Sequence, residues 1–296
     1  MKRILFVAAL MSVGCGQKRD TDIIVAYGRE NNSGTYMYFK EHVLGGVDFA
    51  ANVQTLPGTA AVINAVSKDP RSIGYGGIGY VKGVKTLKVE KDDASAAVEP
   101  TLENVVSGLY PISRYLYFYT AGEPSGLAQH FIDWVRNEAG QKICKDVGYY
   151  PIPLNKRPPA SAAPSDMPTG TITVKGSDTM VILGQRWAEY YMHEHPGILV
   201  QITGGGSGTG IAALINGSTN ICQSSRPMSA KEREQIRAKY GTDAVEYAVA
   251  MDGLAVFVHE SNPVTEVTLD QLKSIYTGVT ASWKDLGRGG RGTTTP

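Results

Sequence analysis

The chain has 296 residues, and its 29 basic and 28 acidic side chains leave a formal net charge of +1 at pH 7. This balance excludes the broad cationic surface with which proteins bind nucleic acid or anionic lipid, so any preference for an anion must come from a local site. An apolar fraction of 42% is typical of a soluble protein with a sizeable core, and the length allows two domains of ordinary size.

The segment 1–15 resembles a bacterial lipoprotein signal. Two basic residues precede an apolar stretch, 4–13, that is too short to span a bilayer, and small residues then lead to Cys15. We expect cleavage before Cys15, lipidation of this cysteine, and a polar tether over 16–21. Ser12 stands where such signals usually have leucine or another apolar residue, so an ordinary secretory signal is the alternative. Either signal predicts export.

Strand-like and helix-like runs alternate along the rest of the chain, which predicts an α/β protein. The expected strands are 23–27, 115–120, 171–175, 199–203, 245–250 and 254–259, and the expected helices are 59–67, 126–137, 180–193, 210–216, 230–240 and 269–276. Ser229 and Thr268 stand immediately before two of these helices and are predicted N-caps.

Two short stretches place Ser-Gly-Thr where a strand-like run gives way to a helical pattern: Ser33-Gly34-Thr35 and Ser207-Gly208-Thr209. Arg29 precedes the first stretch, and the glycines 204–206 precede the second. Free backbone N–H groups at a helix start, adjacent hydroxyls and glycines that admit a ligand together form a cradle for an anion. The glycines could also form a plain tight turn, but the second matching stretch and the arginine favour an anion site.

A Pro-rich segment, 155–169, interrupts the alternation. Four prolines stand there among small and polar residues, which predicts a solvated, semi-extended linker. The tail 287–296 is rich in Gly, Arg and Thr, and we expect it to be frayed.

Motifs on both sides of this linker carry a resemblance to a known family. After the linker they are 176–180, 187–189, 204–214, 224–226, 252–255, 262–264 and 275–283. Before the linker they are Arg29 with 33–35, then 78–80, 110–114, Gln141 and 148–151. The later set resembles the first half, and the earlier set the second half, of the phosphate-binding proteins of bacterial high-affinity phosphate ABC importers. The resemblance covers nearly all of residues 22–154 and 170–287.

The two halves stand in the reverse of the family's order. A circular permutation explains this order if the linker joins the family's own termini and new termini open in a loop, which proteins tolerate when the old termini lie close together. A tandem gene truncated at both ends would look the same. A signal placed directly before the body favours the permutation.

The resemblance implies a two-lobed periplasmic-binding-protein fold of type II, in which each lobe is a mixed sheet flanked by helices. We expect lobe B to combine 22–112 with 263–296, and lobe A to span 113–262 with 155–169 looped out. The chain would then cross between the lobes near 112–113 and 260–263. The protein is expected to be a monomer.

The resemblance also implies a set of phosphate contacts. Arg29 would be the cationic partner, the stretch 33–35 (Ser33, Gly34, Thr35) would supply one helix start, and Ser207 would donate from another. Thr179 and Met180 would donate backbone N–H groups from a third helix start, with the Thr179 hydroxyl added. Arginine suits this task because its fork can bind two oxygens at once.

The sequence departs from the family at Ser225, where some members have an aspartate that accepts the phosphate proton. Serine can accept a hydrogen bond but lacks the charge that rejects fully ionised oxyanions such as sulfate, so selectivity is open. Asp178 is a candidate substitute acceptor, and Ser177 is a further candidate contact. Arg226 could add a second cation or pair with a carboxylate.

Other residues have structural interpretations. Asp252 and Trp187 are interpreted as a turn residue and a core ring. If Cys15 carries lipid, Cys144 and Cys222 are left to form either a disulfide or two buried thiols. His193 and His195 flank a helix end, where histidines commonly complement the helix dipole, so we expect no metal site and no cofactor.

The function implied by the resemblance is capture of inorganic phosphate between two lobes and its delivery to an ABC permease, outside the cytoplasm and on a lipid anchor. The alternative is an extracytoplasmic oxyanion sensor or surface-interaction protein with the same fold. No nucleophile–base pair and no clustered Asp/His metal constellation is evident in the sequence, so an enzyme such as a hydrolase is not expected.

Overall fold

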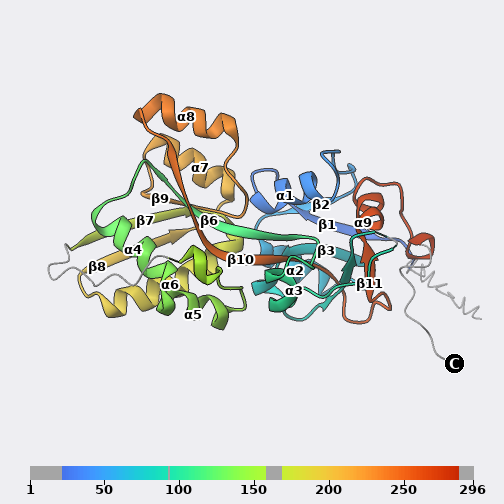
Figure 1. The fold of residues 1–296 in the computed structure, drawn as a ribbon. Coiled ribbons are helices and arrows are strands. Elements are labelled where there is room, and N and C mark those ends of the chain that lie inside the picture. The colour runs from blue at the N-terminus through green and yellow to red at the C-terminus, as the bar shows by residue number, and fades with distance from the viewer. Residues whose placement is uncertain (1–21, 93, 158–168, 287–296) are drawn as a thin grey trace, which may run out of the picture.

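The computed structural model describes residues 22–92, 94–157 and 169–286, which form an elongated molecule with two lobes (Figure 1). The predicted signal, tether, most of the linker and the C-terminal tail lie outside the described residues. We use the names lobe B and lobe A for the two parts as the structure divides them.

Lobe B is built from both ends of the described chain. Its strands are β1 (Val25–Arg29), β2 (Gln54–Leu56), β3 (Ser72–Gly77), β4 (Lys85–Thr86), β5 (Lys88–Glu90) and β11 (Glu266–Thr268). Its helices are α1 (Gly34–His42), α2 (Thr59–Val66), α3 (Leu102–Val106), α9 (Leu269–Tyr276) and the 3-10 turns η1 (Ile78–Tyr80) and η4 (Trp283–Leu286). Ile24 and Ala26 share one buried core with Leu272 and Tyr276, so segments about 250 residues apart in the chain pack together.

Lobe A holds the middle of the chain. Its strands are β6 (Ser113–Ala121), β7 (Gly170–Gly176), β8 (Ile198–Thr203) and β9 (Ile221–Ser224). Its helices are α4 (Gly126–Arg136), α5 (Glu138–Val147), α6 (Val181–Glu194), α7 (Ser207–Asn216), α8 (Ala230–Tyr240) and the 3-10 turns η2 (Leu154–Lys156) and η3 (Asp178–Met180). Alternate residues of β6 bury on opposite faces: Leu116 and Phe118 pack in the core that contains α4, α5 and α6, whereas Tyr119 packs in the core beneath α7 and α8.

One long strand, β10 (Ala244–Val258), belongs to both lobes. It pairs antiparallel with β6 as far as Gly253, and with β3 from Leu254 onward. The resulting nine-stranded sheet of the described residues has the order β2-β1-β3-β10-β6-β9-β7-β8, with β4 also on β10, while β11 and β5 form a separate pair. The same alternation continues in lobe B, where Ala255 and Phe257 face α2 and their neighbours face α1 and α9.

The position of β10 corrects two expectations. The runs 245–250 and 254–259 were predicted as separate strands, but they are parts of a single strand. The chain crosses between the lobes at Gly253–Leu254 rather than at 260–263, so the end of β10 belongs to lobe B. The physical reason is that the apolar side chains of 254–258 are buried by lobe B helices on both faces.

Several helices begin where local sequence signals predicted, or within a few residues of that position. Ser229 and Thr268 are N-caps as predicted, and each forms a capping box with the residue three positions later. Helix α7 begins at Ser207, three residues before the predicted start. Trp187 is a fully buried ring in lobe A, as predicted, and its indole N–H donates to the carbonyl of Gly140 at 2.7 Å.

The first and last described segments lie side by side at the far end of lobe B (Figure 1). The amide of Trp283 donates to the Asp22 carbonyl at 2.8 Å, and the amide of Ile24 donates to the Ala281 carbonyl at 2.9 Å. Within the described residues, no helix combines the length and the apolar character needed to cross a membrane.

Candidate functional site

The first Ser-Gly-Thr stretch forms the start of α1 at the end of β1. Ser33 has extended backbone dihedral angles and is the N-cap, and its oxygen accepts hydrogen bonds from the amides of Thr35 at 3.1 Å and Tyr36 at 3.4 Å. The Ser33 oxygen therefore stabilises the helix start, while the hydroxyl proton stays available for another acceptor.

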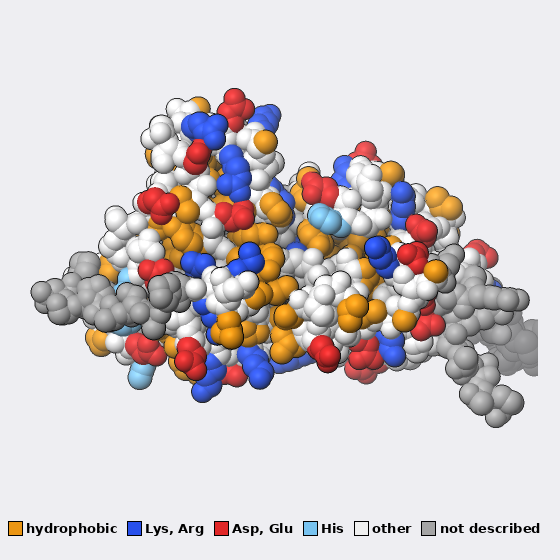
Figure 2. Space-filling model, viewed as in Figure 1, with side chains coloured by type: hydrophobic (Ala, Val, Ile, Leu, Met, Phe, Trp, Pro, Cys, Tyr) orange, Lys and Arg blue, Asp and Glu red, His pale blue; other side chains and the backbone are white. Residues whose placement is uncertain are grey.

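The second stretch begins α7 from the opposite lobe. Gly205 and Gly206 have φ values of +112° and +91°, a backbone that other residues rarely adopt, and they turn the chain from β8 into the helix. The amide of Gly208 donates to the Asn32 carbonyl at 3.0 Å, and the Asn32 side chain donates to the Gly205 carbonyl at 3.0 Å. The two stretches thus contact each other directly across the lobes, beside the notch visible between α1 and α7 in Figure 2.

The third helix start reaches the same point. Residues of η3 lead into α6, and the Thr179 hydroxyl lies 2.9 Å from the Thr35 hydroxyl, 144 residues away in the chain. A Cβ on Gly77 would lie 2.6 Å from the methyl carbon of Thr179, so only glycine leaves room for that methyl group. The amide of Met180 donates to the Ser177 carbonyl at 3.1 Å in this structure, and its role as a phosphate contact stays a prediction.

Arg29 supplies positive charge at this point. Its side chain is 1% exposed, and it donates to Thr59 at 2.9 Å and to the Asp178 carboxylate at 2.7 Å. Burial lowers the pKa of the guanidinium and the Asp178 charge opposes that shift, so arginine stays protonated. Its Nε, which is buried, has no hydrogen-bond partner among the described residues. The other Asp178 oxygen accepts from the amide of Gly205 at 2.8 Å.

Three serines of lobe A form a hydroxyl cluster against α1. Ser177 donates to Ser225 at 2.9 Å, and the Ser225 amide donates to the Ser207 oxygen at 3.1 Å. A Cβ on Gly34 would lie 2.3 Å from the Ser207 oxygen and 2.7 Å from the Ser225 oxygen. The closed contact between the lobes therefore depends on the absence of a side chain at position 34.

Arg226 has a carboxylate partner. Its guanidinium donates to the two oxygens of Glu232 at 2.6 and 2.9 Å, a bidentate pair within lobe A. Of the two interpretations of this residue, ion pairing is the one that the structure shows. Its Nε has no hydrogen-bond partner among the residues described.

One buried ion pair was missed as part of the site. Arg114 and Asp252 face each other where β6 and β10 cross between the lobes, with nitrogen–oxygen distances of 2.8 and 3.1 Å. Asp252 therefore lies in a strand and not in a turn as interpreted. Arg114 also donates to the Thr35 hydroxyl at 2.9 Å, which connects it to the converging helix starts. The available signal was a charged residue inside each of two otherwise uncharged runs, Arg114 within 113–121 and Asp252 within 247–258.

The two described cysteines are free and do not form a disulfide. Cys144 is buried in the core beneath α4–α6, and Cys222 is buried in the separate core beneath α7 and α8. Because burial raises the pKa of both thiols, each behaves as a small apolar core residue. No group of three or more His, Cys, Asp or Glu side chains that could hold a metal occurs in the described part of the chain.

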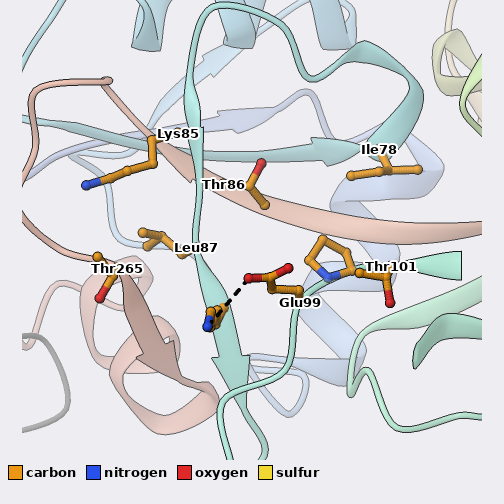
Figure 3. Close-up of a pocket in the computed structure, with 9 residues that line it drawn as sticks. Ile78, Lys85, Thr86, Leu87, Glu99, Thr101 and Thr265 are labelled. Atoms are coloured by element: carbon orange, nitrogen blue, oxygen red, sulfur yellow. Dashed lines mark ion pairs between the residues drawn. The ribbon is translucent and has the colours of Figure 1, made fainter. Parts of the chain in front are cut away.

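Lobe B also contains an open pocket of about 440 Å³ (Figure 3). Its lining includes Leu87, Pro100 and the ion pair of Lys88 with Glu99, whose charged atoms lie 3.5 Å apart. None of the predicted phosphate contacts lines this pocket. A second cavity, of about 570 Å³, lies beside the first Ser-Gly-Thr stretch and is lined by Glu30, Asn31, Asn32, Tyr36 and Thr55.

Comparisons with known proteins agree with this architecture. A family model described as a PBP superfamily domain matches residues 16–138 and 161–296. The phosphate-binding protein PstS 2 of Streptococcus agalactiae serotype V is 31% identical over 308 residues, which cover 97% of this chain and 98% of the relative. The chain belongs to the PstS family of the PBP superfamily.

Two further PstS-like proteins differ in how much of the chain they match. A crystal structure of the phosphate-binding protein of a phosphate ABC transporter from Streptococcus pneumoniae TIGR4 has a TM-score of 0.68 and 26% identity, covering 89% of this chain and 99% of that one. The phosphate-binding protein PstS of Pseudomonas aeruginosa PAO1 is 41% identical, but over 132 residues that cover 43% of this chain and 41% of the relative. The mixed sheet flanked by helices is a periplasmic-binding-protein fold.

Proposed function

We propose that this protein binds inorganic phosphate between its two lobes and delivers it to an ABC permease. The observation that carries the proposal is the convergence of Arg29 with the helix starts at Ser33–Thr35, Thr179 and Ser207 across the lobe interface. The names and transport context of the PstS relatives support phosphate as the ligand and transport as the role. They favour transport over the sensor or surface-interaction alternative, and binding over catalysis.

The chemistry of the converging groups suits a small tetrahedral anion. Phosphate must exchange its water shell for many donors, and arginine N–H, hydroxyl and helix-start N–H groups are strong donors to its oxygens. Monoprotonated phosphate also needs an acceptor. Ser225 has no charge, so Asp178, whose carboxylate already contacts Arg29, is the acceptor that we propose. Sulfate, which has no proton to donate, would then be repelled by this carboxylate.

Calorimetry on the mature protein tests the proposal. The protein should be titrated with phosphate, arsenate, sulfate and molybdate. Phosphate and arsenate should bind tightly, because both carry a proton near neutral pH that Asp178 can accept, and sulfate should bind weakly. Tighter binding of sulfate than of phosphate would overturn the assignment of the ligand. Light scattering on the same sample should show a monomer with and without phosphate.

We also propose that the protein is exported and held on a membrane by lipid on Cys15. The sequence of segment 1–15 supports this proposal, and the similar Streptococcus pneumoniae structure is that of the phosphate-binding protein of a phosphate ABC transporter. Metabolic labelling with a radioactive fatty acid should mark the wild-type protein and not the Cys15→Ala variant. A labelled variant, or an unlabelled but fully processed wild type, would contradict the anchor.

The order of the two halves is proposed to be a circular permutation relative to part of the family. Two observations support it: the Streptococcus agalactiae relative matches end to end, whereas the Pseudomonas aeruginosa relative matches less than half of the chain. The side-by-side position of Asp22 and Trp283 fits a loop that was opened there. A protein rebuilt as 170–287 followed by 22–154 should fold and bind phosphate. Failure of this rebuilt chain to fold would favour the truncated tandem gene.

A further inference from the structure

The buried ion pair at the crossing of the lobes needs an explanation beyond stability. Arg114 and Asp252 have side chains that are 2% and 0% exposed. Moving two charges out of water costs about as much as their attraction returns, and well-packed apolar residues would often stabilise the fold equally well. Burial raises the pKa of Asp252 and Arg114 opposes that shift, which shows the two effects in competition.

The guanidinium of Arg114 forms hydrogen bonds to Thr35 as well as to the Asp252 carboxylate. Its Nε and Nη2 both donate to one oxygen of Asp252, and Nη2 uses its second hydrogen to donate to the Thr35 hydroxyl at 2.9 Å. The other Asp252 oxygen accepts from the amide of Ile78 at 2.9 Å. Asp252 is thus fixed from both sides, and it fixes in turn the direction in which Arg114 reaches Thr35.

The Arg114–Thr35 contact affects how the hydroxyl protons of Thr35 and Thr179 are used. Arginine can only donate, so the Thr35 oxygen must accept from Arg114. The Thr35 and Thr179 hydroxyls, 2.9 Å apart, share one further hydrogen bond, in which either can be the donor. Two hydroxyl protons are available and one is used, so one O–H group remains to donate to an anion in either arrangement. Because the Thr35 oxygen also accepts from Arg114, the Thr35 hydroxyl proton is confined to the directions that this N–H leaves open.

This chain of contacts connects the two lobes. Arg114 and Asp252 are register partners at the crossing of β6 and β10, Thr35 belongs to lobe B, and Thr179 belongs to lobe A. The Thr35–Thr179 contact therefore bridges the two lobes. Opening of the lobes would separate the two hydroxyls and leave Arg114 with Thr35 alone.

We propose that Arg114, held by Asp252, is a positioning residue that couples closure of the lobes to the alignment of the Thr35–Thr179 hydroxyl pair on the bound anion. This inference deepens the proposed function and rests on it. In this role Arg114 acts on the anion through Thr35, whereas Arg29 is assigned a direct contact; the buried Nη1 of Arg114 has no hydrogen-bond partner among the described residues.

A double-mutant cycle tests this role, with phosphate affinity measured by calorimetry and stability measured by urea unfolding. Arg114→Lys keeps a cation for Asp252 but cannot bridge two acceptors with a planar fork, and Thr35→Val removes the hydroxyl at nearly constant volume. We expect each single variant to weaken phosphate binding by roughly 10- to 100-fold. The double variant should bind within about twofold of Thr35→Val alone, because Arg114 acts through Thr35.

Matched variants control for stability. Arg233→Lys alters another arginine–carboxylate pair, with Glu246 at 2.6 Å, outside the converging helix starts and should leave affinity unchanged. If Arg114→Lys does not fold, Arg114→Gln with Asp252→Asn removes both buried charges and replaces it in the cycle. Effects that multiply in the double variant, or unchanged affinity in Arg114→Lys, would overturn the positioning role while wild-type phosphate binding stands. A wild type that binds no phosphate would instead overturn the proposed function itself.

Discussion

The two Ser-Gly-Thr stretches have the same sequence and each lies at a helix start, yet their serines have different roles. Ser33 stands outside α1 as its N-cap, and its oxygen accepts from two amides of that helix. Ser207 is the first residue of α7, and its oxygen instead accepts from the amide of Ser225, 18 residues away. Ser33 thus stabilises the start of its own helix, whereas Ser207 connects α7 to the segment after β9 in the same lobe.

The difference comes from the residue before each stretch. Gly206 takes a φ of +91°, so α7 can begin at the serine, whereas Asn32 precedes the first stretch, and no residue other than glycine has a positive φ in the described chain. Helix α1 therefore begins one position later in the motif, at Gly34. The threonines differ as well: Thr35 contacts both Arg114 and Thr179, while Thr209 accepts a long, 3.4 Å hydrogen bond from Asn32. Identical motifs thus give different sites.

Removal of the cation from the first stretch should have the largest effect. Arg29→Ala should weaken phosphate binding by about 2–5 kcal/mol, because a charge-assisted partner is lost from a desolvated site. Calorimetry checks the affinity, and circular dichroism checks that the fold persists. Arg233→Ala is the matched control. Binding within threefold of wild type would show that the first stretch does not carry the charge of the site.

The two glycines of the motifs should respond differently to the same change. A Cβ at Gly34 would lie 2.3 Å from the Ser207 oxygen, whereas one at Gly208 would lie 3.2 Å from the Asn32 carbonyl oxygen. We expect Gly34→Ala to weaken phosphate binding by about 100-fold by holding the lobes apart, and Gly208→Ala by about tenfold or less. Small-angle scattering with phosphate should show the first variant more open. Equal losses would mean that closure does not depend on position 34.

The two serines separate stability from affinity. Ser33→Ala should lower the free energy of unfolding by about 1 kcal/mol, because α1 loses its N-cap. Ser207→Ala should instead weaken phosphate binding about tenfold through loss of one hydroxyl. Urea unfolding and calorimetry on both variants make the comparison. The reverse pattern, with Ser207 governing stability and Ser33 governing affinity, would contradict the roles assigned here.

The smallest effect is expected at Arg226, which tests whether the second stretch has its own cation. Burial raises the pKa of Glu232, but hydrogen bonds from Arg226 and Ser229 outweigh it, so the net pKa is below the usual 4.5. A lowered carboxyl pKa contributes stability above 4.5 that is lost as the pH falls through the folded-state pKa.

Arg226→Ala should therefore destabilise the protein by about 1 kcal/mol at pH 7 and by progressively less in acid, and should leave phosphate affinity unchanged. Urea unfolding at a series of pH values measures the first effect and calorimetry the second. A clear loss of affinity would show that Arg226 does act as a second cation.

Local sequence signals determined much of the secondary structure of this protein. The alternation of strand-like and helix-like runs, the capping residues Ser229 and Thr268, and the two Ser-Gly-Thr helix starts depend on residues within a few positions of one another, so they can be read directly. The family resemblance correctly indicated the fold class. It also implied a phosphate site formed by Arg29, Thr35, Thr179 and Ser207, which stays a prediction, although Thr35 and Thr179 do meet across 144 residues of the chain.

Only the tertiary structure decided which partner each charged group takes. Arg29 meets Asp178 149 residues away, and Arg114 meets Asp252 138 residues away, distances over which no local pattern specifies a contact. The same holds for β10, which continues through both lobes because helices of each lobe bury its side chains, and for the two cysteines, which lie in separate cores. Hydrophobic periodicity determines which face of a strand is buried. The packing of the whole chain determines which elements cover that face and which partner neutralises each buried charge.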